Sequence, residues 1–111
     1  MSYLITNTEK QIEKYKILLF MLENEKEQLI EKLPGINNKM RYLTNKENDI
    51  ELKSVLTIFT SQIDDHKKGN LMLCVMEKNS INSYINEINE QINLITLNLI
   101  LSERFLNDLE K

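Results

Sequence analysis

The sequence predicts an all-α protein: an elongated antiparallel bundle of three long, coiled-coil-like helices with a short extra helix in the first connection. Apolar residues recur at alternating steps of three and four, the spacing of helices that pack lengthwise on other helices. The chain contains only two Gly and one Pro, whereas a β-sandwich or barrel needs turn residues at short intervals. With 111 residues, we expect a single helical domain over residues 1–111.

The first helix is expected over residues 7–33. Two overlapping capping boxes, Thr6 with Glu9 and Thr8 with Gln11, indicate its start. In each pair, the threonine hydroxyl can accept a hydrogen bond from the backbone N–H of the second residue, whose side chain can accept one from the backbone N–H of the threonine. The apolar seam of this helix, with Thr8 and Lys26 at its polar steps, comprises Ile5, Ile12, Tyr15, Leu19, Leu22, Leu29 and Leu33. We expect this face to lie against the other helices.

Pro34 and Gly35 are expected to end the first helix. Proline disfavours the helical conformation in the residue before it, and glycine can adopt the positive φ of a helix C-terminus. The following residues 36–43 contain apolar side chains at helical spacing, namely Ile36, Met40 and Leu43. They predict the short extra helix.

The second helix is expected over residues 45–68, after a start signal formed by Thr44 and Glu47. Its expected core stripe consists of Leu52, Leu56, Phe59 and Ile63, flanked by Ile50 and Val55. Lys67, Lys68 and Gly69 are typical of a helix C-terminus, where cations face the negative end of the helix dipole. One glycine costs only about 1 kcal/mol in a helix, so an alternative is that the second helix runs straight through Gly69 into the third.

The third helix is expected over residues 70–110. Its heptad seam is interrupted only by a lysine and a serine and comprises Leu71, Cys74, Lys78, Ile81, Ile85, Ile88, Ile92, Ile95, Leu99, Ser102, Leu106 and Leu109. Isoleucine at both core positions of the heptad, over residues 81–95, disfavours a parallel two-stranded coil. This composition favours three or four helices around the seam.

A second apolar stripe is expected near the end of the third helix, opposite its seam. A longer third helix would extend past the first helix there, and the stripe would need a cover. One interpretation covers it with residues 36–43 of the same chain, and the other covers it with a partner protein or a second copy. The candidate protein-binding residues are therefore Leu94, Leu97, Leu101, Phe105, Ile36 and Met40.

The residues predict no catalytic, cofactor-binding or metal site, so we expect no enzyme and no small-molecule substrate. His66 is the only histidine, and Cys74 lies on the apolar seam without a second cysteine or a base beside it. A net charge of −3 and a pI near 5.2 disfavour nucleic-acid binding. No apolar run approaches the roughly 20 residues of a membrane span.

Function is expected to lie in contacts with other proteins. A lone cysteine fits a reducing cytoplasm, and residues 1–6 lack the basic and apolar regions of a signal peptide. The sequence therefore predicts a cytoplasmic, non-catalytic interaction module, such as an adaptor, an export chaperone or a phage-type inhibitor. The alternative is a structural coiled-coil oligomer that assembles with itself.

Overall fold

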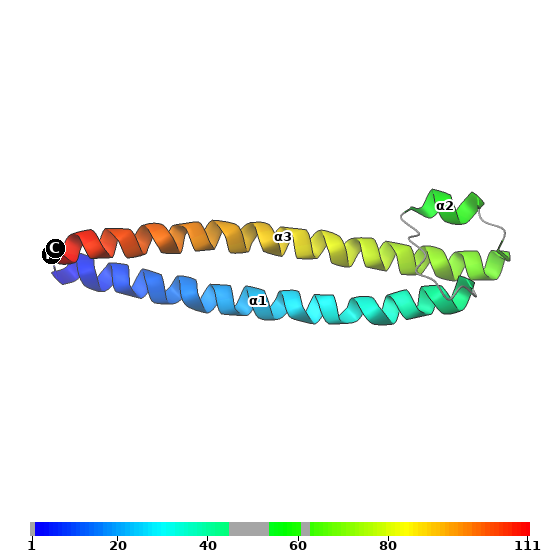
Figure 1. Ribbon diagram of the computed structural model, residues 1–111, viewed down its shortest axis with the longest axis horizontal. Coiled ribbons are helices and arrows are strands. Elements are labelled where there is room, and N and C mark those ends of the chain that lie inside the picture. Colours follow the sequence, from blue (N-terminus) through cyan, green and yellow to red (C-terminus); the bar gives the residue numbers. More distant parts are fainter. Residues whose placement is uncertain (1, 45–53, 61–62) are drawn as a thin grey trace. The chain divides into compact units, whose positions relative to one another are not determined.

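The computed structural model describes residues 2–44, 54–60 and 63–111, and every element in these ranges is an α-helix (Figure 1). Helix α1 spans Ser2–Thr44 and has 43 residues, α2 spans Val55–Thr60 and has 6, and α3 spans Asp65–Glu110 and has 46. The predicted all-helical class is confirmed for this part of the chain. Among its helices, none combines the length and apolarity that a membrane span requires.

The predicted break at Pro34 is wrong, because α1 passes through Pro34 and Gly35 without interruption. The separate short helix over residues 36–43 is therefore the last part of α1. The seam explains why, since the same heptad spacing continues across the proline. Thr8 and Lys26 keep the phase, and every residue of the series is buried or half-buried: Ile5, Thr8, Ile12, Tyr15, Leu19, Leu22, Lys26, Leu29, Leu33, Ile36, Met40 and Leu43.

Pro34 is tolerated because it lies off the seam. Proline removes one backbone hydrogen bond of a helix and crowds the carbonyl group four residues earlier, here that of Ile30. Both Pro34 and Ile30 are exposed, so water can solvate that carbonyl. Burial of the seam on both sides keeps the helix continuous.

Helix α1 also begins earlier than the capping boxes predict. It starts at Ser2, which places Thr6 and Thr8 inside the helix. The hydroxyl of Thr8 donates a hydrogen bond of 2.8 Å to the carbonyl oxygen of Leu4, one turn back. Bonding of this kind satisfies a hydroxyl in the middle of a helix, so Thr8 occupies a buried seam position without acting as a cap.

Helix α2 is much shorter than the predicted second helix. Only Ile58 of α2 is fully buried, whereas Leu56 and Phe59, two residues of the predicted core stripe, are 70% and 60% exposed. That stripe was assigned for a long helix, but α2 has fewer than two turns. The rest of the predicted start, over residues 45–53 with Glu47, Ile50 and Leu52, lies outside the described residues.

The predicted helix end at Lys67, Lys68 and Gly69 is also wrong, since these residues belong to the first turns of α3. Asp64 caps this helix. Its carboxylate accepts a hydrogen bond of 2.8 Å from the backbone N–H of His66, and its carbonyl accepts one of 3.0 Å from the N–H of Lys68. An aspartate at this position also interacts favourably with the helix dipole. The alternative, in which the second helix runs through Gly69 into the third, is right only in that α3 passes through Gly69 without interruption, because α2 ends at Thr60 and α3 begins at Asp65.

The chain divides into two compact units. Unit 1 contains the described residues of Met1–Glu27 and Asn86–Lys111, and unit 2 contains those of Gln28–Ile85. Parts of both long helices thus contribute to each unit. That both units fold together as one domain stays a prediction.

Unit 2 holds a buried apolar core to which all three helices contribute. Ile58 of α2 and Leu71 and Val75 of α3 are fully buried. The other members of the buried cluster are Ile36, Met40, Leu43, Cys74 and Ile81. Helix α2 therefore completes this core by covering the seams of the two long helices.

The described part of unit 1 contains one segment each of α1 and α3 and no further helix, and its seam is less well covered. Of its apolar seam residues, only Ile12 and Ile88 are buried, with exposed fractions of 7% and 4%. The others remain half-exposed, namely Ile5, Tyr15, Leu19, Leu22, Ile92, Ile95, Leu99, Leu106 and Leu109. A third helical segment, which α2 supplies in unit 2, is missing from the described part of unit 1.

Candidate protein-interaction surface

An exposed apolar stripe lies on α3 in unit 1. With the seam of α3 at heptad positions a and d, Leu94 and Leu101 occupy position c and Leu97 occupies position f, on the opposite side of the helix. Phe105 follows at position g, next to position c. Their side chains are 60%, 52%, 53% and 47% exposed, respectively. We name these four residues the outer stripe.

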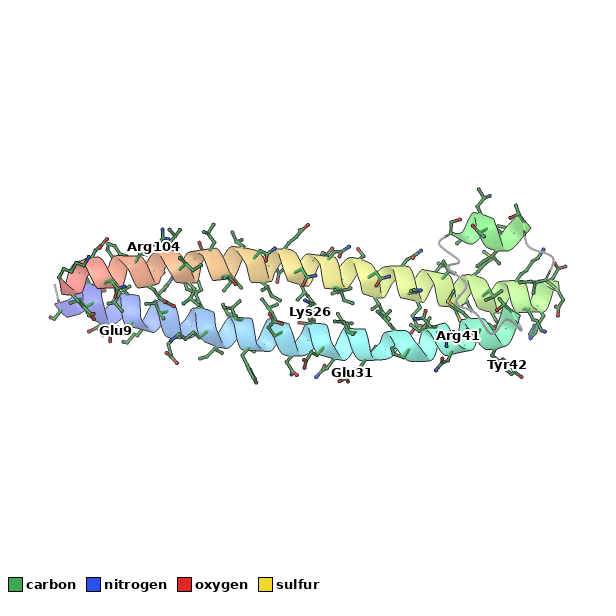
Figure 2. All side chains as sticks on the ribbon, viewed as in Figure 1. Glu9, Lys26, Glu31, Arg41, Tyr42 and Arg104 are labelled. Atoms are coloured by element: carbon green, nitrogen blue, oxygen red, sulfur yellow. The ribbon has the colours of Figure 1, made fainter. Side chains whose placement is uncertain are left out.

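Charged residues bound the outer stripe at both ends. Glu87 and Glu90 precede it at positions c and f, and Arg104 and Asp108 follow at positions f and c. All four are exposed. Arg104, labelled in Figure 2, lies on the side of α3 that faces away from α1. The stripe is therefore a short apolar surface with acidic residues before it and an arginine within its last turn.

The structure separates the two predicted groups of binding residues. Ile36 and Met40 are only 8% and 2% exposed and belong to the core of unit 2, where they pack with α2 and the start of α3. They do not cover Leu94, Leu97 and Leu101, which are exposed in unit 1. The premise of an overhanging third helix is also wrong, since α1 with 43 residues nearly matches α3 with 46.

A second exposed apolar group lies on α1 in unit 1 and was not predicted as a surface. Ile17, Phe20 and Met21 are 56%, 75% and 59% exposed. The apolar run of residues 17–22 reaches round most of the helix, whereas the seam buries only one side of α1. Ile17, Phe20 and Met21 lie outside the heptad phase, and this is the signal that identifies them as surface residues.

Polar seam residues of the two long helices meet in unit 1. A depression of about 210 Å³ is lined by Thr8 and Ser102, the polar steps of their seams, together with Asn7, Gln11 and Phe105. The first turns of α1 thus lie beside the last turns of α3. The lining contains no ionisable side chain, so this depression offers hydrogen bonds but no general acid or base that could activate the hydroxyls of Thr8 and Ser102.

Cys74, the one cysteine of the sequence, is buried in the core of unit 2. Burial raises the pKa of the Cys74 thiol; the charge of Lys39 acts in the opposite direction and that of Glu77 in the same one. A thiol in this setting stays protonated and is a poor nucleophile. His66 is exposed, and no group of three or more His, Cys, Asp or Glu residues in the described ranges could hold a metal ion.

Comparisons of the chain with protein-family models, curated proteins and solved structures find no match. The outer stripe and the half-covered seam of unit 1 therefore remain the features from which a function can be inferred.

Proposed function

We propose that this protein is a non-catalytic interaction module whose binding surface is the outer stripe of α3. The observation that carries the proposal is the exposure of Leu94, Leu97 and Leu101 in one row, bounded by charged residues. Contiguous apolar surfaces bordered by polar residues are typical of protein-binding sites. A helix that docks there would cover the leucines and leave the charged ends at the rim.

The proposal includes antiparallel, coiled-coil-like packing of α1 and α3 within each unit. It is supported by the unbroken heptad phase of both seams and by the depression that brings residues 7–11 near residues 102–105. Isoleucine at both core positions prefers a core of three or four helices. In unit 2, α2 supplies a third helix to the core, whereas the described part of unit 1 contains segments of α1 and α3 alone.

Adaptors, export chaperones and protein inhibitors act through surfaces of this kind, and we propose a cytoplasmic role of this class. The net charge of −3 supports a protein partner over a nucleic acid. The depression in unit 1 is lined by no ionisable side chain, so it gives no support to a role in catalysis.

The test is affinity capture from extracts of the native cell with Leu97→Glu as the stripe variant. The matched control is Ser83→Glu, which places the same charge at position f of α3 on an exposed residue outside the stripe. We expect a bound protein, identified by mass spectrometry, to be retained by the control and lost with Leu97→Glu. If no protein, including further copies of this chain, depends on Leu97, the proposal is wrong.

A further inference from the structure

We propose that the occupant of the outer stripe is the same stripe on a second copy of this chain, with the two α3 helices antiparallel. This inference rests on the proposed function and names its partner. Two copies related by a two-fold axis present one surface to itself, so each residue and its counterpart exchange roles across the axis. The surface must therefore be complementary to its own reversed image.

The spacing of the leucines meets this requirement. Leu94 and Leu101 lie at position c, and Leu97 lies between them at position f. Reversing the helix direction exchanges Leu94 with Leu101 and keeps Leu97 near the centre. In an antiparallel pair, Leu94 of each copy would face Leu101 of the other, while the two Leu97 side chains would pack beside the axis.

The charges at position f also make the surface complementary to its own reversed image. Glu90 and Arg104 lie seven residues before and seven residues after Leu97. In the same antiparallel alignment, Glu90 of each copy would face Arg104 of the other, which creates two oppositely charged pairs at the rim. A parallel alignment would instead place Glu90 against Glu90 and Arg104 against Arg104, with unfavourable Coulomb energy.

The charges at position c define where the contact ends. Glu87 and Asp108 are both acidic and exposed, and they would face each other about two turns beyond the leucines. Their repulsion disfavours an extension of close contact past the turns that hold Glu90 and Arg104. The interface is thus a short one, and its dimer should depend on protein concentration.

The experiment is sedimentation equilibrium of the full chain over a concentration series, at low and at moderate salt. We expect a monomer–dimer equilibrium that Leu97→Glu weakens by roughly a hundred-fold, because each copy would bury a carboxylate among leucines. Ser83→Glu should leave the dimerisation constant unchanged. Circular dichroism of each variant checks that the helices remain intact.

The register is tested by exchanging the charges. Glu90→Arg and Arg104→Glu should each weaken the dimer by about five-fold or more at low salt, since each creates two like-charge contacts. The double variant Glu90→Arg with Arg104→Glu should restore the affinity, and salt should reduce all these differences.

Three results would overturn the inference. They are a chain that stays monomeric at every concentration, a dimer that tolerates Leu97→Glu, and single charge variants that the double variant does not rescue. A monomer that nevertheless captures another protein through Leu97 would contradict self-pairing while leaving the proposed function intact. A dimer insensitive to Leu97, with no Leu97-dependent capture, would contradict both.

Discussion

At the scale of single residues, Pro34 shows how position relative to the seam decides what a helix accepts. Its ring opposes the helix, yet Leu33 and Ile36 on either side keep the heptad phase and pack inward. A Cβ atom added to Gly35, beside it, would meet no heavy atom within 4 Å beyond its own stretch of helix. These two residues therefore weaken α1 on its solvent side without interrupting it.

Replacing Pro34 with alanine should stabilise the protein by about 2 kcal/mol. The gain is the helix-interior cost of proline, about 3 kcal/mol, reduced by about 0.4–1 kcal/mol because proline also restricts the unfolded chain. Urea unfolding followed by circular dichroism measures the change. As a comparison, Gly35→Ala should add only about 0.5–1 kcal/mol; a Pro34→Ala variant that is less stable than the wild type would show that the proline serves the native packing.

The buried thiol of Cys74 should make stability fall at alkaline pH. Burial raises its pKa in the folded state above the ordinary value of 9.0. Below pH 9.0 both states are protonated and the stabilisation is complete; above it the unfolded chain releases a proton that the folded chain retains, so the free energy of unfolding decreases. Chemical unfolding is measured at a series of pH values, from neutral pH to about 1.5 pH units above the ordinary pKa of a thiol. The slope of the free energy of unfolding against pH then gives this effect.

The control for this titration is Cys74→Ala, which removes the thiol while keeping the other titrating groups. The variant should be less stable throughout, because it leaves a small cavity, but its stability should decrease less steeply above pH 9.0. Parallel curves for the two proteins would mean that the folded and unfolded thiols titrate alike.

At the scale of the elements, seam phase was a better guide than the start and stop signals. The heptad pattern correctly predicts the buried side of α3, where Ile81 and Ile88 lie. The helix ends at Glu110, the residue at which its end was expected. The breaks at Pro34 and Gly69 were wrong because continuous burial outweighs the local preferences of proline and glycine.

The second helix could not be predicted because its apolar residues fit more than one face. A long helix over residues 45–68 would bury Leu56 and Phe59, whereas α2 instead buries Ile58 in the core of unit 2, together with residues of both long helices. Which side of so short a helix turns inward depends on how it docks, and that depends on tertiary contacts. The outer stripe, by contrast, was identified from spacing alone, while its lack of a cover from the described residues required the structure.

The docking of α2 gives a prediction with a matched control in the same helix. Ile58→Ala should destabilise the protein by about 2–5 kcal/mol, because the side chain is fully buried in the core of unit 2. Leu56→Ala removes a side chain that is 70% exposed and should change stability by less than about 0.5 kcal/mol. Thermal unfolding of the two variants compares them directly. If the two variants lost equal stability, α2 would have to dock with a different side toward the core than the one that buries Ile58.

At the scale of the whole molecule, the two units differ in how completely their seams are covered. Unit 2 contains fully buried residues from α2 and α3, whereas most seam residues of unit 1 are half-exposed. Local opening is easier where few apolar contacts hold a segment. Native-state hydrogen exchange should therefore show faster exchange for amides near Leu19 and Ile95 than for those near Leu71 and Val75.

This difference should diminish when the outer stripe is occupied, because a partner that binds only the folded form adds its binding free energy to unit 1. Exchange measured at low and high protein concentration tests the effect. Exchange in unit 1 should slow at high concentration for the wild type and stay unchanged for Leu97→Glu. Uniform slowing in both proteins would point to a contact elsewhere.

The division of the chain between its units also sets an order of events during folding. Unit 2 is one continuous stretch, Gln28–Ile85, whereas unit 1 joins the two ends of the chain. Contacts between distant segments carry a larger loop-closure entropy and form later than local ones. On the ribosome, the first helical turns of α1 must wait for the last residues of α3 to be synthesised, so nascent unit 1 exposes its seam until those residues have emerged.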